Sequence, residues 1–157
     1  MIRLATHADA PAIAAIWNPV IAQTTITFTP DEKTAAQVAD LITPQTPCLV
    51  AVHAGQVAGF ARYGPFRSGA GYRFSAEHTI LLHPSARGQG IGRILLGALC
   101  DHAQGAGLHM LHAGISAENP RAVEFHASCG FRTLAVLPEV GFKFGRWIDL
   151  VLMQKRL

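Results

Sequence analysis

The stretch ARGQGIG, residues 86–92, places three glycines within five positions, between an apolar strand-like run and a helix-like run. Gly88, Gly90 and Gly92 free the backbone from side-chain clashes and allow a ligand to approach it closely. A turn of this kind that opens a helix leaves unpaired N–H groups at the helix N-terminus, where anions bind. The pattern predicts an α/β fold with a phosphate-binding turn, to which Arg87 would add positive charge.

Two common phosphate motifs do not fit this turn. The dinucleotide pattern GxGxxG requires glycine where residue 93 is Arg, and a P-loop requires GK followed by Ser or Thr. A pyrophosphate group of another ligand class is the remaining functional interpretation. On this motif alone, a glycine turn with a purely structural purpose stays open as the alternative.

The composition indicates one folded domain over residues 1–157, because half of the residues are hydrophobic and only 15% are charged. No apolar run approaches the roughly 18 residues of a membrane span, and the N-terminus reads as a folded helix rather than a signal peptide. The net charge of +3 is scattered, which argues against nucleic-acid binding. Three cysteines without a CxxC motif predict neither disulfides nor a metal site, and fit a reducing cytoplasm.

Hydrophobic periodicity predicts an α/β order of β-α-α-β-β-β-α-β-α-β-β. A helix capped by Thr29, with Pro30 at its first position, is expected to run toward Pro44, and Asn119 is expected to cap the last helix. The predicted strands cover residues 2–5, 47–52, 56–63, 72–83, 108–115, 131–138 and 147–157, and the other helices lie near 13–21 and 90–104.

Four stretches together resemble one enzyme superfamily. The R-x-x-G-x-G string from Arg87 is similar to the pyrophosphate loop of the GNAT N-acetyltransferases, and NPRAVEFHASCGF (119–131) resembles their last helix. The stretches YRFSAEHTILLHP (72–84) and GFKFGRWIDLVLMQ (141–154) resemble the phosphinothricin and methionine sulfoximine acetyltransferase branch. The resemblance implies a mixed, largely antiparallel sheet of about seven strands with about four helices, acetyl-CoA as co-substrate, and a homodimer.

The same resemblance assigns the acetyl-CoA site. Backbone N–H groups near Leu81 and Leu82 are expected to meet the pantetheine arm, in a gap where that strand splays from its neighbour. Asn119 would contact the same arm or its surroundings. The implied acetyl-CoA residues are Leu81, Leu82, Arg87, Gly88, Gln89, Gly90, Ile91, Gly92, Arg93 and Asn119.

Acetyl transfer to an amine requires a proton acceptor, because an ammonium group has no lone pair. Glu77 is the only acidic residue between Asp40 and Asp101, and partial burial would raise its pKa toward a useful range. A solvated strand glutamate is the structural alternative. His126 stands where many superfamily members carry a tyrosine that protonates the leaving thiolate, so it is a second catalytic candidate beside the ordinary interpretation as a core histidine.

The acceptor is predicted from the remaining polar groups. Arg73 lies four residues before Glu77 in one expected strand, which would place both on one face and let the guanidinium hold a substrate carboxylate. Phe28 and Tyr72 are expected to wall the pocket, although packing explains them equally well. An Arg on the surface is the alternative for Arg73.

The sequence therefore predicts acetyl transfer from acetyl-CoA to the α-amine of a small amino acid analogue such as phosphinothricin, methionine sulfoximine or methionine sulfone. Glu77 would be the general base of a direct attack, and no metal is expected. Acetylation of another small amine or of a protein N-terminus is one alternative. A CoA-binding regulatory domain without turnover is the other.

Overall fold

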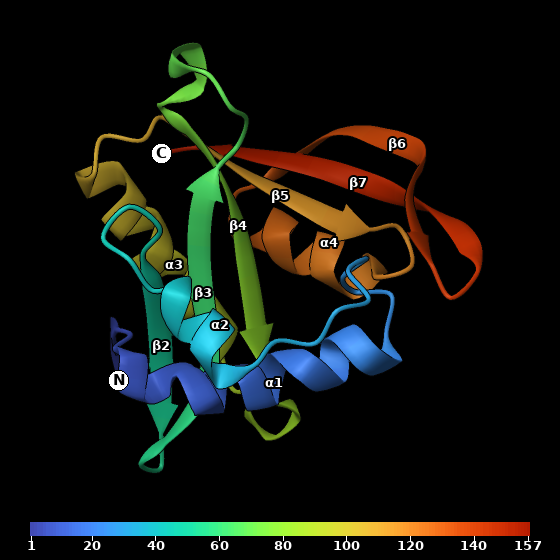
Figure 1. The fold of residues 1–157 in the computed structure, drawn as a ribbon. Coiled ribbons are helices and arrows are strands. Elements are labelled where there is room, and N and C mark those ends of the chain that lie inside the picture. The colour runs from blue at the N-terminus through green and yellow to red at the C-terminus, as the bar shows by residue number, and fades with distance from the viewer.

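The computed structural model describes all residues, 1–157, as one seven-stranded sheet with helices on both faces (Figure 1). The strand order is β1-β2-β3-β4-β5-β7-β6, and every pair is antiparallel except β4–β5. The predicted mixed, largely antiparallel fold with four helices is confirmed. The strands are β1 (Ile2–Leu4), β2 (Cys48–His53), β3 (Gln56–Pro65), β4 (Ser75–Leu82), β5 (Met110–Ser116), β6 (Arg132–Lys143) and β7 (Arg146–Arg156); the helices are α1 (Ala10–Gln23), α2 (Ala35–Asp40), α3 (Ile91–Gly105) and α4 (Pro120–Ser128).

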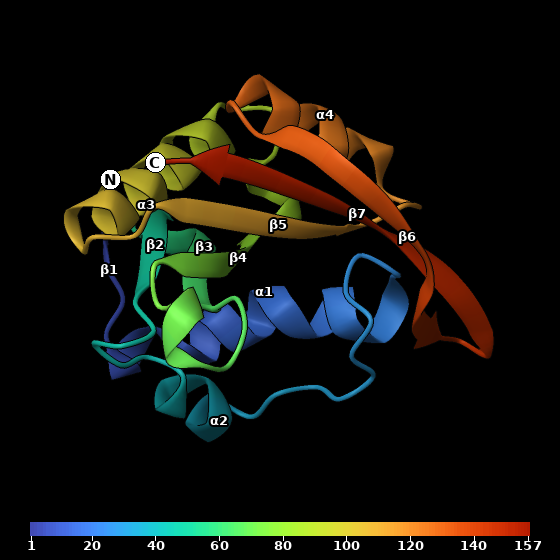
Figure 2. The same cartoon turned by 90° about the horizontal axis from the view of Figure 1, so that it is seen from above.

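Two apolar cores hold the layers together. Helices α3 and α4 cover one face of the sheet, and α1 and α2 cover the other (Figure 2). The α3 side buries Leu95 and Leu99 among strand residues, and the α1 side buries Ile13 and Trp17 against Phe60. Because both helices carry apolar residues at spacings of three and four, each presents one stripe to the sheet.

The strands β4 and β5 separate after a short parallel contact. They pair only from Ser75 with Met110 to Glu77 with His112, and then run apart (Figure 1). The rest of β4 remains hydrogen-bonded to β3 on its other side. A gap therefore opens inside the sheet, in front of the glycine turn, and the edges of β4 and β5 that face it are not paired with each other.

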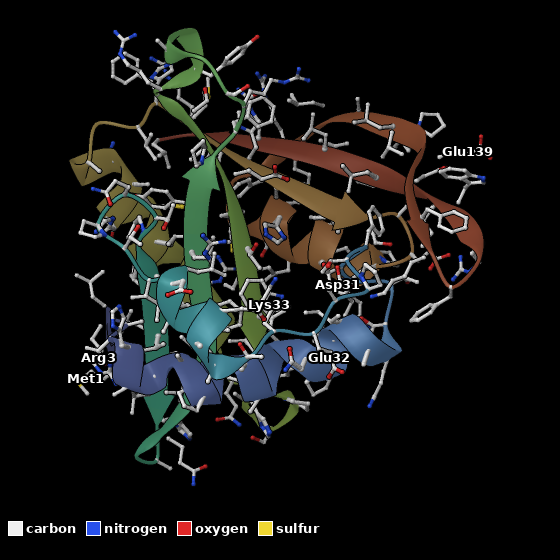
Figure 3. The ribbon with its side chains drawn as sticks, viewed as in Figure 1. Met1, Arg3, Asp31, Glu32, Lys33 and Glu139 are labelled. Carbon is white, nitrogen blue, oxygen red and sulfur yellow. The ribbon has the colours of Figure 1, made fainter.

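The second helix begins later than the sequence predicts. Thr34, not Thr29, caps α2: its hydroxyl accepts a hydrogen bond from the Gln37 N–H, and the Gln37 side chain accepts one from the Thr34 N–H. This reciprocal cap satisfies two backbone N–H groups at the start of the helix, and residues 30–33 are not helical, so the predicted cap at Thr29 is wrong by five residues. The preceding residues 31–33 are extended (Figure 3).

The fourth strand is shorter than the sequence predicts. Residues 70–72 form a single 3₁₀ turn after Gly69, whose φ is 106°, and the strand begins only at Ser75. Tyr72 and Arg73 therefore lie outside β4. The alternation argument that placed Arg73 on the same strand face as Glu77 is wrong.

The C-terminal strands form a long, bent hairpin. Phe144 and Gly145, with φ of 53° and 74°, make its two-residue turn, as expected for a hairpin whose strands twist right-handedly. The register shifts near Thr133 and again between Leu137 and Gly141, a segment that contains Glu139 with φ 53° (Figure 3). The hairpin thereby curves away from the sheet centre (Figure 2). No helix of the chain combines the length and apolar character needed to cross a membrane.

Candidate active site

A cavity of about 750 Å³ occupies the gap between β4 and β5. Its walls come from both strands, from the start of α3, from α4 and from residues 26–28. Along β4 the lining runs from Glu77 to Leu82, a span of about 16 Å for an extended chain. The cavity thus connects the glycine turn at one end with a carboxylate at the other.

The glycine turn presents a row of free backbone donors. Gly88 and Gly90 have φ of 75° and 76°, and Gly90 occupies the cap position of α3. The N–H groups of residues 88–92 have no hydrogen-bond partner in the chain. Successive free N–H groups at a helix N-terminus bind a phosphate, and Arg87 lines the cavity beside them.

The free edge of β4 offers a second set of donors and acceptors. The His83 N–H donates to the Ala58 carbonyl of β3, and alternation along the strand points the same groups of Leu81 toward β3 as well. Ile80 and Leu82 instead direct their backbone groups into the gap. The expectation of a free Leu81 N–H is therefore wrong, whereas Leu82 has the orientation that the expectation requires.

Side chains of the turn contribute less than the sequence suggests. The Arg93 guanidinium donates to the carbonyl and hydroxyl of Ser128, both at 3.0 Å, so it ties α3 to α4 and does not line the cavity. Gln89 donates to the Ser85 carbonyl. Arg121 does line the cavity, and the sequence analysis missed it because nothing in NPRAVEFHASCGF sets this arginine apart.

Asn119 has two tasks at the cavity wall. Its side-chain oxygen accepts a hydrogen bond from the Ala122 N–H and caps α4, as predicted. Its amide nitrogen has no partner in the chain, and the residue lines the cavity. A donor is therefore available there for a carbonyl of the bound group.

Glu77 lies at the end of the gap where β4 and β5 part. Its carboxylate has no hydrogen-bond partner and faces the cavity. The side chain is open to the cavity yet crowded by protein on several sides; this partial desolvation raises its pKa, while nearby His112 lowers it. Gly114 makes room for it, because a Cβ there would lie 2.7 Å from Glu77 Oε1.

Two buried histidines meet across the gap. Nε2 of His78 on β4 lies 3.0 Å from Nε2 of His126 on α4. Their Nδ1 atoms approach the His112 carbonyl at 2.8 Å and the Ala122 carbonyl at 2.7 Å. Burial lowers the pKa of both imidazoles. The sequence analysis named His126 as a candidate but identified no partner for it.

The wall opposite the sheet is residues 26–28, which the C-terminal hairpin holds in place. Lys143, almost fully buried, donates to the Thr24 and Thr27 carbonyls at 2.6 and 2.7 Å. Gly141 leaves space for the Phe28 ring, which lines the cavity as predicted. The GFKFG segment that signalled the branch resemblance thus shapes the acceptor side of the cavity.

Tyr72 and Arg73 lie elsewhere. Both line a separate cavity of about 390 Å³ near Tyr63. The Arg73 guanidinium sits over the Phe74 ring and donates to the Ala70 carbonyl. Arg73 and Glu77 of one chain therefore line different cavities. No group of three His, Cys, Asp or Glu side chains is arranged to hold a metal.

A sheet that splays beside a cradle of free N–H groups, with a free carboxylate at the far end, defines a CoA-dependent acyltransferase. The chain matches the Acetyltransferase (GNAT) family over residues 15–131 and belongs to it. It is an acetyl-CoA-dependent N-acetyltransferase, which excludes the binding-only alternative. The free donors at residues 88–92 fit a pyrophosphate, and those of Ile80 and Leu82 fit amide groups of the pantetheine arm.

Relatives and solved structures resemble the chain over nearly its full length. It is 39% identical to L-methionine sulfoximine/L-methionine sulfone acetyltransferase of Salmonella typhimurium, covering 99% of the chain and 94% of the relative. Ribosomal-protein-alanine N-acetyltransferase from Brucella melitensis is 41% identical, with a TM-score of 0.95 and coverage of 100% and 99%. Phosphinothricin acetyltransferase from Sinorhizobium meliloti in complex with AcCoA is 31% identical, with a TM-score of 0.93 and coverage of 100% and 88%.

The contact between Gly114 and Glu77 generates a prediction. Gly114→Ala should lower kcat/KM about 10- to 100-fold, because the new methyl group must displace the carboxylate from its position. The melting temperature should fall little, since a flexible side chain absorbs the clash. Steady-state kinetics and thermal unfolding measure the two effects.

Gly97→Ala is the matched control. Gly97 lies inside α3 and a Cβ there meets nothing within 4 Å, so the variant should keep full activity and gain about 0.5–1 kcal/mol of stability. Equal kinetics of Gly114→Ala and wild type would show that the position of Glu77 does not matter.

Proposed function

We propose that this enzyme transfers the acetyl group of acetyl-CoA to the α-amine of a small amino acid analogue of the methionine sulfoximine, methionine sulfone or phosphinothricin type. The observation that carries the proposal is the free Glu77 carboxylate at the acceptor end of the gap. The activities named for two relatives support the acceptor class. Residues 26–28 line the cavity near this carboxylate and form the wall of the acceptor end.

Glu77 is the proposed general base. Acetyl-CoA, when bound, supplies a thioester whose carbonyl carbon accepts a nucleophile. The amine must be neutral at that moment, and a carboxylate within reach, directly or through one water, takes its proton. The raised pKa of Glu77 makes it a stronger base than a solvated glutamate.

A protein N-terminus is the second candidate acceptor. The Brucella melitensis relative bears the name of a ribosomal-protein-alanine N-acetyltransferase. An N-terminal alanine also presents an α-amine, but followed by a peptide instead of a free carboxylate. The two acceptor classes are therefore distinguishable by the chain that follows the amine.

A thiol-release assay with acetyl-CoA tests the acceptor class. Methionine sulfone, methionine sulfoximine and phosphinothricin should release CoA with kcat/KM values at least tenfold above that of an alanine-initiated peptide. The physical reason is that residues 26–28 wall the acceptor end and would stand in the way of the peptide chain that follows an N-terminal alanine. A preference for the peptide would replace the proposed acceptor with the second candidate.

The pH profile tests the base. Below its pKa the Glu77 carboxyl is protonated and accepts no proton, so kcat/KM should fall as pH decreases through a raised carboxyl pKa. Glu77→Gln should reduce kcat about 10²- to 10⁴-fold and remove this limb, while acetyl-CoA affinity stays the same.

Glu77→Asp controls for the charge, because it keeps the carboxylate and shifts it by one methylene. It should retain the acidic limb at reduced rate. A Glu77→Gln variant with unchanged turnover would assign the base elsewhere.

We further propose that the enzyme is a homodimer in which a second copy of the chain packs against β6. β6 is an edge strand of twelve residues, and long unpaired edges attract another strand. Exposed apolar side chains concentrate on the β6–β7 hairpin, and such a concentration is typical of an interaction surface. The exposed ones are Leu134, Val136, Leu137, Val140, Phe142, Phe144 and Trp147.

Light scattering tests the dimer. The wild type should show twice the chain mass of 16.8 kDa, and Val136→Lys should shift it toward the monomer because a charge blocks edge pairing. Ile94→Lys is the control, since this apolar residue is exposed on α3 and away from the hairpin. A monomeric wild type would remove the proposal.

The cytoplasm is the proposed location. Cys48, Cys100 and Cys129 are all free, as expected for a chain kept in a reducing compartment.

A further inference from the structure

The histidine pair requires a proton count. His78 Nδ1 lies 2.8 Å from the His112 carbonyl and His126 Nδ1 lies 2.7 Å from the Ala122 carbonyl. A carbonyl oxygen only accepts hydrogen bonds, so each Nδ1 carries a hydrogen. A neutral imidazole has one N–H, and in both rings that N–H is now assigned.

The remaining contact joins two nitrogens that would both be acceptors. With both rings neutral, two lone pairs would face each other across 3.0 Å between the Nε2 atoms. One additional proton between these atoms turns the contact into a charge-assisted N–H···N hydrogen bond, which is shorter and stronger than a neutral one. Three N–H groups, and therefore one positive charge on the pair, would satisfy all three contacts.

We propose that His78 and His126 share one proton, and that this pair is the proton donor to the leaving CoA thiolate. The inference rests on the acetyl transfer proposed above. Both histidines line the cavity, His126 from α4 and His78 from β4, and their Nε2 atoms face each other. His78 is therefore a second member of the acid and not a core residue that merely fills space.

The proton balance of the reaction closes. The amine nitrogen forms a bond to the acetyl carbon and loses one proton to Glu77. The bond from the acetyl carbon to sulfur breaks, and its electron pair remains on sulfur. Sulfur takes the shared proton, so the pair passes from one positive charge to none, and the proton on Glu77 returns to the pair through solvent before the next turnover.

The strand geometry separates the two proton-transfer groups. Glu77 and His78 are consecutive in β4, and consecutive strand residues project to opposite faces. Glu77 lies on the face of α1 and residues 26–28, and His78 lies on the face of α4. A base for the amine and an acid for the thiolate thus flank the same gap without neutralising each other.

The surroundings limit the pair to one extra proton. The rings pack against Phe125 and Phe131, and both are almost fully buried. Burial lowers the pKa of each ring, and a positive charge on His126 lowers the pKa of His78 further. The other ionisable groups nearby are Glu77 on the opposite face of β4, His112 on β5, Arg121 on α4, and Lys155 of β7 behind Phe131.

Nitrogen-15 NMR of histidine-labelled enzyme, without acetyl-CoA, tests the shared proton directly. Below neutral pH both rings should show protonated Nδ1, and one low-field proton should couple to Nε2 of both. This proton signal should disappear in a single step as the pH rises. It should be absent in His78→Phe and present in His53→Asn, because His53 is an exposed histidine of β2. A neutral Nε2–H form in either ring at all pH values would overturn the proposal.

Kinetics test the use of that proton. His78→Phe and His126→Phe should lower kcat with acetyl-CoA on the order of 10², with little change in the KM for acetyl-CoA. An acetyl thioester with a more acidic thiol leaves without a proton, so it should restore most of the loss in both variants. An equal loss of kcat with acetyl-CoA and with the more acidic thioester would mean that the histidines are structural.

Glu77→Gln separates this proposal from the proposed function. A more acidic thiol does not replace the general base that Glu77→Gln lacks, so this variant should stay slow with acetyl-CoA and with the other thioester. If no amine acceptor supports turnover, the acetyl transfer proposal fails, and the NMR experiment still reports on the proton pair.

Discussion

The parallel contact between β4 and β5 ends after three residue pairs, and the rest of the molecule is organised around that ending. A fully paired sheet would have no interior edge and no cavity. Because β4 continues along β3 while β5 turns toward β7, the backbone groups of Ile80 and Leu82 stay free in the gap. An unpaired strand edge, ordinarily a liability at the border of a sheet, thus lies protected inside this sheet and faces the cavity.

Glycines let other groups approach this gap closely. Gly92 sits against Leu82 and Phe125 at the start of α3, and a larger residue would push the helix away from the strand. Gly114 leaves room for the Glu77 carboxylate in the same way. Close approach of the backbone thus shapes both ends of the cavity: the glycine turn beyond Leu82 and the Glu77 carboxylate. The stretch of β4 from Glu77 to Leu82 spans about 16 Å.

The acceptor side depends on a segment remote in sequence. Lys143 donates to two carbonyls of the 24–27 segment, and Arg146 pairs with Glu118, whose carboxylate also accepts from Thr25. The hairpin that carries the exposed apolar residues is therefore the same hairpin that fixes the wall at Phe28.

Local sequence determined the turn, the apolar stripes and most helix ends, because the residues responsible are neighbours in the chain. Gly88 and Gly90 specify a conformation by themselves, and Asn119 caps its own helix. The family resemblance added acetyl-CoA and the candidate residues Glu77 and His126. The error at Thr29 arose within the same local range, where a capping box at Thr34 outweighed a proline.

Only the tertiary structure decided the contacts between residues that lie far apart in the sequence. The pair of His78 with His126 spans 48 positions, and the hold of Lys143 on Thr24 spans 119. The exclusion of Arg73 from the cavity depended on where β4 begins, which pairing with β3 and β5 sets. Sequence spacing indicates which face a residue shares with its neighbours, but proton sharing and cavity walls depend on distances of about 3 Å that only the assembled sheet brings about.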